Sequence, residues 1–289
     1  MNCIEQVTTD RYTAIHGDCV EALRGLPDQS IGYSIFSPPF ASLYTYSNSP
    51  RDMGNVRNDA EFFEHFDFLI AELRRVMKPG RNVSFHCMDM PSSKERDGVI
   101  GLKDFPGDLL RAFQRHGFIF HAKATIWKDP VTAMQRTKAL GLLHKSVREN
   151  AAMCRMGIPD YLITVRAPGD CERVTHGEEY PVDLWQKVAS PVWMDINPSD
   201  TLQYMSAREH DDERHICPLQ LEVIRRGVML WTNPGDIVLS PFMGIGSEGY
   251  VSLEMGRRFV GVELKASYFR QAVANLASAT AKTADLFAA

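Results

Sequence analysis

The sequence of 289 residues lacks several features that would place it in other classes of protein. No apolar run approaches the ~20 residues of a membrane-spanning helix, and residues 1–5 do not have the form of a signal peptide. The six cysteines include no C-x-x-C pair, which argues against a disulfide framework or a zinc site. We therefore expect a cytoplasmic protein with reduced thiols and no bound metal.

The charge balance and the composition limit the architecture further. The net charge of −4 excludes a generally basic surface, so any contact with nucleic acid must come from a local patch. No internal repeat and no low-complexity linker divides the sequence. Because 44% of the residues are hydrophobic, the chain can bury a sizeable core. We predict a single domain over residues 1–289 that carries an insert.

Alternating strand and helix patterns predict an α/β protein with a parallel sheet. In the first unit, a short strand over 12–15 and a helix over 19–26, with Asp18 as its N-cap, lead to a strand over 31–36. The next expected elements are a helix over 59–77, a strand over 82–87, a helix over 105–116 and a strand over 118–127.

The stretch Ser37-Pro38-Pro39-Phe40 directly follows the predicted strand over 31–36, and its composition indicates a chemical role. Consecutive prolines have fixed φ and no N–H, so they hold their carbonyls in directions that the fold sets in advance. A hydroxyl precedes them and an aromatic ring follows. Such a stretch can stack on a flat ring and accept hydrogen bonds from an amino group at its edge. The alternative is an ordinary Pro-Pro turn that closes a strand.

A second candidate site lies near the other end of the sequence. A strand over 237–239 is followed by a glycine-containing loop, a helix over 248–255 and a strand that closes in Glu263, which is the order of a nucleotide-binding βαβ unit. Gly246 and Glu263 are 17 residues apart (263 − 246), close to the ~20 expected before a ribose-binding acid. The third glycine of a dinucleotide site and a Walker A lysine are both missing, which favours a smaller nucleoside such as S-adenosylmethionine. The alternative is a βαβ unit without a ligand.

The same part of the sequence includes two further predicted helices. One covers 214–231 with an entry segment at its start, where Pro218 suits the first turn. The other begins near Lys265 and runs to about residue 279.

Residues 128–166 are locally basic in an acidic protein. A solvated face and a surface that tracks phosphates are both compatible with this pattern. If the second is right, the residues that contact DNA are Lys128, Arg136, Lys138, His144, Lys145, Arg148 and Arg155. Residues 170–212 are loop-rich, and we interpret 128–212 as an insert outside the central sheet that recognises the target. The polar stretch 41–58 is either a substrate lid or an irregular surface loop.

Both candidate sites resemble motifs of one family, the DNA amino-methyltransferases. Ser37-Pro38-Pro39-Phe40 is similar to their catalytic [D/N/S]-P-P-[Y/F/W] motif, and residues 240–247, SPFMGIGS, are similar to their D-P-F-x-G-x-G-T cofactor loop. The catalytic motif comes first and the cofactor loop last, which is the order of the β group. Residues 215–220 and 17–31 resemble the segments that precede the two motifs. Together these stretches cover both ends of the sequence, about half of it.

The resemblance implies a Rossmann-like fold for an S-adenosylmethionine-dependent methyltransferase, with a catalytic half at 12–127 and a cofactor half at 214–280. It implies double-stranded DNA as substrate, a homodimer as one assembly, and a prokaryotic or phage origin within restriction–modification. The residues that it assigns to cofactor binding are Asp18, Cys19, His215, Pro218, Ser240, Pro241, Phe242, Gly244, Gly246, Ser247, Glu263 and Leu264. Ser240 replaces the usual Asp of the loop, and we expect Asp236 and Glu263 to supply the polar contacts instead.

The chemistry implied is transfer of a methyl group to the exocyclic amine of a flipped base. Ser37 Oγ and the Pro38 carbonyl would accept hydrogen bonds from the amine, and Phe40 would stack on the base. A cytosine C5 methyltransferase would need a nucleophilic Cys, usually after Pro, and the sequence has no Pro-Cys pair.

Within the family, serine at position 37 favours cytosine N4 over adenine N6 as the target. A methyltransferase of RNA or of a small molecule stays an alternative, as does a non-catalytic DNA-binding protein on the same fold.

Overall fold

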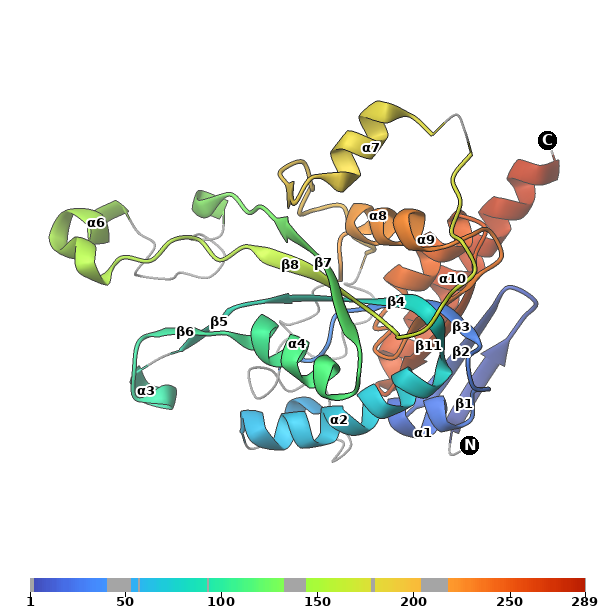
Figure 1. Ribbon diagram of the computed structural model, residues 1–289, viewed down its shortest axis with the longest axis horizontal. Helices are drawn as coiled ribbons and strands as arrows, with labels where there is room; N and C mark the ends of the chain where they lie inside the picture. Colours follow the sequence, from blue (N-terminus) through green and yellow to red (C-terminus); the bar gives the residue numbers. More distant parts are fainter. Residues whose placement is uncertain are drawn as a thin grey trace.

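The centre of the protein is a mixed β-sheet (Figure 1). The computed structural model describes residues 3–40, 53–56, 58–92, 94–132, 144–177, 180–203 and 218–288. In these residues a nine-stranded sheet has the order β1-β2-β11-β10-β3-β4-β8-β7-β9. Its strands are β1 (Cys3–Thr8), β2 (Tyr12–Gly17), β3 (Ile31–Phe36), β4 (Met77–Met88), β7 (Ile119–Ile126), β8 (Asp160–Arg166), β9 (Val192–Trp193), β10 (Ile237–Ser240) and β11 (Arg258–Glu263).

The middle of the sheet is parallel, as the sequence predicts. Neighbouring strands from β2 through β11, β10 and β3 to β4 all pair in parallel, while β1 and β8 run antiparallel to the strands beside them. At the far edge, β7 pairs antiparallel with β8 and parallel with β9. The fold is therefore an α/β sheet with a parallel centre and an antiparallel extension at each side.

Helices cover both faces of the sheet, so its central strands are buried on both sides. On one face lie α1 (Cys19–Arg24), α2 (Asp59–Val76) and α4 (Phe105–Arg115), and on the other lie α8 (Leu221–Trp231), α9 (Ser247–Glu254) and α10 (Ala266–Ala288). Side chains along β3 point alternately to the two faces of the sheet. Ile35 packs in the core beneath α8, α9 and α10, and Phe36 packs in the core beneath α1, α2 and α4. On α2, Phe62 stacks on Phe66 inside the core.

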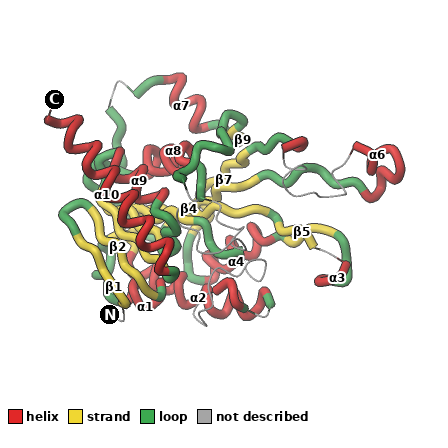
Figure 2. The backbone as a smooth tube through the Cα atoms, turned by 180° about the vertical axis from the view of Figure 1, so that it is seen from behind, coloured by secondary structure: helices red, strands yellow, loops and turns green. Residues whose placement is uncertain are grey.

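Shorter elements surround this frame. They are β5 (Met90–Ser92), β6 (Gly101–Lys103), α3 (Lys94–Asp97), α6 (His144–Asn150), α7 (Val182–Ala189) and the 3-10 turns η2 (Met53–Asn55) and η4 (Ala151–Met153). The β5–β6 hairpin with α3, and the segment with α6, project from the sheet on the same side (Figures 1 and 2). Both leave the sheet at the same end of its strands, because β4 ends and β8 begins there. We call these projections the hairpin arm and the α6 arm.

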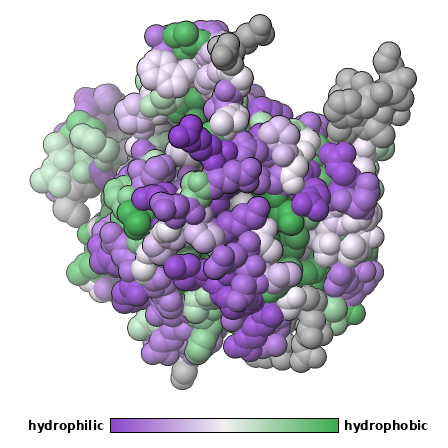
Figure 3. All heavy atoms as spheres, turned by 45° about the vertical axis from the view of Figure 1, so that its right-hand side comes forward, coloured by the Kyte–Doolittle hydropathy of each residue, from purple (hydrophilic) through white to green (hydrophobic). Residues whose placement is uncertain are grey.

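The surface is polar where Figure 3 shows it, with hydrophilic residues over most of that face. Among the described residues, no helix combines the length and the apolar character needed to cross a bilayer.

The predicted insert at 128–212 is wrong in one respect. Strand β8 lies within it, yet pairs between β4 and β7 inside the sheet, with Asp160 opposite Met88 and Arg166 opposite Asn82. This strand was not predicted because basic residues surround its largely apolar run, Leu162-Ile163-Thr164-Val165, which is buried. Strand β9 also lies within the predicted insert and pairs with β7 at the edge of the sheet, so the segments outside the sheet are those that flank these two strands.

The prediction for Pro218 also needs correction, and most of the stretch 41–58 lies outside the described residues. Helix α8 begins at Leu221 with Gln220 as its N-cap, so Pro218 precedes the helix instead of lying in its first turn. In the stretch 41–58, predicted as either a substrate lid or an irregular surface loop, residues 41–52 and 57 lie outside the described residues. Met53, directly after residue 52, is buried in the core, so this end of the stretch is not a free loop.

Candidate active site

The two candidate motifs lie next to each other at the ends of β3 and β10, the adjacent strands at which the strand order of the sheet changes its sense. Strand β10 pairs with β11 on one side and with β3 on the other. The chain leaves β10 toward β11, and it leaves β3 toward β4, so the two loops diverge at the carboxyl ends of the strands, which is where open α/β sheets bind their ligands. We call the region between these two loops the crevice. Ser37 follows the last residue of β3, and Pro241 follows the last residue of β10. Sequence-distant motifs thus share one end of the sheet.

Aromatic rings connect these two loops. Phe36 at the end of β3 and Phe242 in the glycine loop have ring centroids 5.8 Å apart. Pro38 is buried, whereas Ser37 and Phe40 are half-buried. The ring of Phe40 is tilted against Phe105, with 6.2 Å between centroids. Its proposed stacking on a base stays a prediction.

Ser37 is the first member of a chain of polar side chains that we call the relay: Ser37, His86, Asp160 and Lys128. Ser37 Oγ lies 3.2 Å from His86 Nδ1, and His86 Nε2 lies 3.3 Å from Asp160 Oδ2. Lys128 Nζ donates to the other carboxylate oxygen of Asp160 at 2.5 Å. Strand register explains this placement, because Phe36 pairs with Phe85 and the next residue of each strand is a relay member.

The relay is largely shielded from water. The His86 side chain is 12% exposed and that of Asp160 6%. His86 Nε2 and Asp160 Oδ2 lie within ion-pair distance, although His86 Nε2 makes no hydrogen bond of ordinary geometry with the described residues. The pKa of Asp160 lies below its ordinary value: burial acts to raise it, and the neighbouring His86 and Lys128 outweigh that effect.

The glycine loop has the backbone that a close ligand requires. Gly244 and Gly246 have φ of +53° and +88°, a region that favours glycine. Gly246 caps α9, where a Cβ would come within 3.3 Å of Ala272. A Cβ on Gly244 would meet nothing within 4 Å, so open space lies beside this backbone.

Glu263 at the end of β11 points back toward this loop. Its Oε2 accepts a hydrogen bond from the Gly244 N–H at 2.9 Å, and its Oε1 accepts one from the Lys265 N–H at 2.8 Å. These backbone donors fix the orientation of the carboxylate. Because a carboxylate oxygen has more than one lone pair, the same oxygens could also accept ribose hydroxyls.

Buried hydroxyls without partners show that the residues present fit a polar nucleoside ligand. The side-chain oxygens of Ser240, Ser247 and Ser267 are buried and have no hydrogen-bond partner within the described part of the chain. They lie at the ends of β10, α9 and α10, around the glycine loop. Buried polar atoms are normally paired, so a ligand that offers hydroxyls and amines would satisfy them.

Asp236, expected to help bind the cofactor, lies at the opposite end of β10 from the glycine loop. Its carboxylate pairs with the buried Arg81 and accepts a hydrogen bond from the Asn233 N–H at 2.7 Å. The expectation was wrong because strand direction places the start and the end of β10 at different edges of the sheet. Asp236 anchors the turn before the strand.

The end of β2 brings Asp18 and Cys19 close to Glu263. Glu263 is paired in register with His16, two residues before Asp18. Asp18 caps α1 by accepting from the Glu21 N–H at 3.0 Å, as predicted. The pKa of the Cys19 thiol is raised well above its usual value by burial and then by the charges of Asp18 and Glu263, so this thiol is not a nucleophile.

Two residues near this cluster were missed by sequence reasoning. His16 Nε2–H donates to the Leu264 carbonyl at 3.1 Å, and its ring stacks on Phe269. Glu248 in the first turn of α9 is buried, and burial raises the pKa of its carboxyl to about 8, with a further contribution from the charge of Glu263. No spacing signal in the sequence indicates either contact.

The residues expected to contact DNA are spread over different surroundings. Lys128 belongs to the relay, while His144, Lys145 and Arg148 are exposed on the α6 arm (Figure 1). Their role in binding DNA stays a prediction. Arg155 is half-buried and donates to the Met156 carbonyl at 3.5 Å. Three predicted residues lie outside the described residues: Arg136 and Lys138 of the DNA-binding set, and His215 of the cofactor-binding set.

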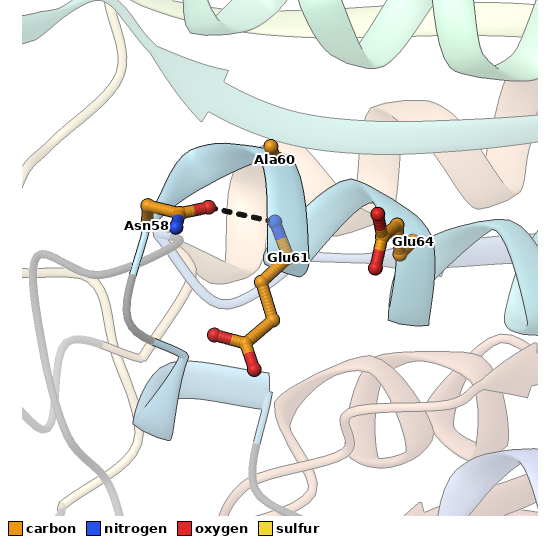
Figure 4. Close-up of a pocket in the computed structure, with 4 residues that line it drawn as sticks. All are labelled: Asn58, Ala60, Glu61 and Glu64. Carbon is orange, nitrogen blue, oxygen red and sulfur yellow. Dashed lines mark hydrogen bonds between the residues drawn. The ribbon is translucent and has the colours of Figure 1, made fainter.

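A hollow lies at the start of α2 (Figure 4). It is lined by Asn58, Ala60, Glu61 and Glu64, and the Asn58 side chain caps the helix by accepting from the Glu61 N–H at 2.9 Å. Its acidic lining does not suit DNA. Within the described part of the chain, no group of three or more His, Cys, Asp or Glu side chains is arranged to hold a metal ion.

Similar proteins are found among the methyltransferases. Type II methyltransferase M.BglII of Bacillus subtilis is 24% identical over 258 residues, which cover 88% of this chain and 65% of the relative, so this chain spans less than two thirds of it. DNA adenine methyltransferase YhdJ of Escherichia coli (strain K12) is 24% identical over 278 residues, 94% of this chain and 85% of the relative.

Solved structures share the fold. PvuII DNA methyltransferase (cytosine-N4-specific) has a TM-score of 0.67 at 16% identity and covers 98% of this chain and 97% of its own. TTHA0409 of Thermus thermophilus, provisionally assigned as a DNA modification methylase and solved with S-adenosyl-L-methionine, has a TM-score of 0.67 at 22% identity, covering 94% and 96%. Residues 33–274 match the profile of the DNA methylase family, and because that match spans most of the chain and both loops of the crevice, the chain belongs to this family.

Proposed function

We propose that this protein transfers a methyl group from S-adenosyl-L-methionine to the exocyclic amine of a base in double-stranded DNA, with cytosine N4 as the preferred target. One observation carries the proposal. The Ser37-Pro38 turn and the Gly244 loop lie at the carboxyl ends of adjacent strands, on the two sides of the crevice. An acceptor for an amine and a cradle for a nucleoside therefore face the same space.

The residues of the glycine loop would hold the cofactor, which supplies a methyl group on a positively charged sulfur when bound. Glu263 is pre-oriented by two backbone amides to accept the ribose hydroxyls. The open space beside Gly244 lets the backbone approach the ligand, and the buried Ser240 and Ser247 hydroxyls offer further polar contacts.

On the other side of the crevice, the Ser37-Pro38 turn would hold the amine. The nitrogen lone pair of such an amine is delocalised into the base, so the amine is a weak nucleophile. Hydrogen bonds from its N–H groups to Ser37 Oγ and the Pro38 carbonyl draw the nitrogen toward tetrahedral geometry and stabilise the charge that develops. The proline restraint keeps these acceptors in place before the substrate arrives, so little reorganisation is needed.

The base has to leave the DNA stack to reach this turn. The hairpin arm and the α6 arm project from the sheet edge that bears Ser37, and DNA held against them would present a flipped base to the crevice (Figures 1 and 2). Phe40 at the mouth of the motif would then stack on that base.

Serine at position 37 is the reason for preferring cytosine. Within the family pattern, serine before the two prolines favours cytosine N4, whereas aspartate favours adenine N6. The similar proteins named above include one adenine-specific and one cytosine-N4-specific enzyme, so overall likeness favours neither base.

The test is identification of the methylated nucleoside. The protein is incubated with methyl-labelled cofactor and unmethylated duplex DNA, and the digested DNA is analysed by mass spectrometry. We expect labelled N4-methylcytosine, and N6-methyladenine would reassign the base. Label in RNA or a small molecule but not in DNA would contradict the DNA substrate, and a protein that binds DNA without consuming the cofactor would be non-catalytic. The variant Glu263→Ala at the same protein concentration controls for contaminating activity.

A further inference from the structure

The relay behind Ser37 resembles the hydrogen-bonded chain that activates nucleophiles in hydrolases, although here its first member faces an amine. We propose that His86 accepts, through the Ser37 hydroxyl, the proton that the substrate amine loses during methyl transfer. This inference rests on the proposed function and assigns a proton acceptor to it. His86 is then a positioning and proton-accepting residue, while Ser37 is the group that touches the substrate.

Asp160 determines which nitrogen of His86 carries the proton. A carboxylate can only accept a hydrogen bond, so the Asp160 oxygen 3.3 Å from His86 Nε2 favours the proton on that nitrogen. His86 Nδ1 is then a lone-pair acceptor, and Ser37 O–H donates to it across 3.2 Å. With its hydrogen turned inward, Ser37 Oγ presents lone pairs to the crevice. That is the orientation in which it can accept from an amine.

Lys128 keeps the Asp160 carboxylate charged in a buried place. Its ammonium binds one carboxylate oxygen at 2.5 Å, while the other oxygen faces His86. The pKa of Asp160 is lowered by these neighbours despite burial, so the anion persists at neutral pH. Contact with Asp160 explains why Lys128, although one third exposed, is directed into the protein and not toward phosphates.

The transfer step balances with these groups. The amine nitrogen forms a bond to the methyl carbon as the carbon–sulfur bond breaks, and the electron pair of that bond stays on sulfur. The nitrogen then carries one proton too many. That proton passes to Ser37 Oγ while the original Ser37 proton passes to His86 Nδ1. The resulting imidazolium faces the negative charge of Asp160, and it returns its proton to water after the product leaves.

Other titratable groups at this end of the sheet are engaged with one another. Tyr161 on β8 donates to Asp89 at 3.4 Å, and Lys123 Nζ lies 3.9 Å above the Tyr161 ring. On the strands beside His86, the groups that face it are Ser37 from β3 and Asp160 from β8. Ser37 and Asp160 are therefore the polar neighbours through which His86 would act.

The first test needs neither cofactor nor DNA. Nitrogen NMR of the ¹⁵N-histidine-labelled protein distinguishes the two neutral tautomers of His86. We expect the Nε2–H form in the wild-type protein. In Asp160→Asn, an amide can donate to Nε2 and the Nδ1–H form should increase. A wild-type His86 in the Nδ1–H form would overturn the proposal, because Nδ1 could then not accept from Ser37.

The second test follows single-turnover methyl transfer to DNA against pH. Followed from about pH 5 to 8, the range in which an unperturbed imidazole changes charge, the wild-type rate should rise, because only a neutral acceptor can take up the proton. His86→Asn places an amide oxygen near the position of Nδ1 but takes up no proton, so the rate should fall roughly 10²- to 10⁴-fold and lose that titration. Cofactor and DNA affinities should change less than about threefold, since no contact to either is removed.

A third variant keeps the proposal testable if His86→Asn does not fold. In His86→Gly, added imidazole should restore part of the rate, which a purely structural role would not allow. A wild-type rate that is flat over the same pH range, or a folded His86→Asn protein with the wild-type rate and profile, overturns the relay while leaving methyl transfer intact. If the wild-type protein methylates no DNA at all, the proposed function itself fails, so the two failures are distinguishable.

Discussion

Phe36 and Phe242 are about 200 positions apart in the chain, yet their rings pack with centroids 5.8 Å apart. One ends the strand that carries the Ser37-Pro38 turn, and the other lies in the glycine loop. Through this contact the position of the proposed amine acceptor depends on the position of the cofactor loop. Correct alignment of nitrogen, methyl carbon and sulfur in an in-line transfer requires that dependence.

Replacing the ring of Phe36 with a smaller aliphatic side chain should therefore affect both halves of the site. Phe36→Leu should lower the free energy of unfolding by about 1 kcal/mol, as for other buried hydrophobic swaps of similar volume, and should weaken cofactor affinity roughly fivefold. Urea denaturation and calorimetry measure the two effects. Phe113→Leu is the matched control, because Phe113 on α4 is equally buried but its ring packs against Phe66, Phe85 and Phe118 instead of Phe242. An equal loss of affinity in both variants would show that general destabilisation, not the contact, is responsible.

Glu263→Ala should weaken binding of S-adenosyl-L-methionine about ten- to a hundredfold. A hydrogen bond to a charged group contributes roughly 1.5–3 kcal/mol, and the carboxylate also orients the Gly244 amide. Glu263→Gln keeps one acceptor oxygen and should lose less. Calorimetry with the folded proteins gives both values, and unchanged affinity in the alanine variant would remove Glu263 from the cofactor site.

The sequence predicted those parts of the site that local chemistry determines. Two prolines after a strand, and glycines before a helix, restrict the backbone wherever they occur, so Pro38 and Gly246 could be assigned from their neighbours alone. Alternating strand and helix patterns likewise sufficed for a parallel sheet, because crossover helices leave few alternatives.

The relay could not be found in the same way. His86 and Asp160 meet only because β8 pairs antiparallel with β4, and β8 was hidden in a basic stretch. The expectation for Asp236 was wrong for a related reason. Asp236 and the glycine loop are separated by only the short strand β10, so they are close in sequence although they lie at opposite ends of that strand. Strand β1 was missed because its residues are mostly exposed and alternate weakly. Long-range pairing, not propensity, decided all of these positions.

Glu248 should make the protein less stable as the pH rises. Its carboxyl has a pKa of about 8 in the folded state against 4.5 as its ordinary value, so between these pH values the folded protein holds a proton that the unfolded chain has lost. Stability from this group is complete below about pH 4.5 and is lost as pH rises to about 8, by an amount on the order of a few kcal/mol. In Glu248→Gln this dependence should vanish.

Urea denaturation of both proteins at a series of pH values isolates this effect, because the difference between them cancels all other titrations. The difference should grow with pH and level off above about pH 8. Parallel curves for the two proteins would mean that Glu248 is already ionised in the fold.

The α6 arm should contribute to DNA binding through its phosphate contacts. Lys145→Ala combined with Arg148→Ala should weaken binding to all sequences and reduce the slope of log K against log salt by ~0.9 per lost contact. Arg111→Ala is the matched control, since Arg111 is exposed on α4 and paired with Asp108. Fluorescence anisotropy with duplex DNA at several salt concentrations measures the slopes. Identical slopes for all three proteins would reduce α6 to a solvated helix.

The parts of the Ser37–Phe40 turn should fail in different ways. Phe40→Ala removes the stacking surface, worth ~1–3 kcal/mol per base, and should weaken capture of the flipped base while the acceptors stay in place. Ser37→Ala leaves the stack but removes an acceptor from the place where charge develops, so the methyl-transfer step should slow ~10²- to 10³-fold, by analogy with oxyanion-hole donors. Cofactor affinity should survive both changes, because Gly244 and Glu263 are untouched.

Single-turnover rates as a function of DNA concentration separate these effects, because Phe40→Ala should raise the concentration needed for half-maximal rate and Ser37→Ala should lower the maximum. Thermal melts have to accompany them, since Phe40 also packs on Phe105 and its loss destabilises the fold. An ordinary Pro-Pro turn would tolerate alanine on either side. A folded Ser37→Ala protein with the wild-type rate would therefore exclude the serine hydroxyl and the relay behind it from the reaction, leaving the Pro38 carbonyl as the acceptor of the amine.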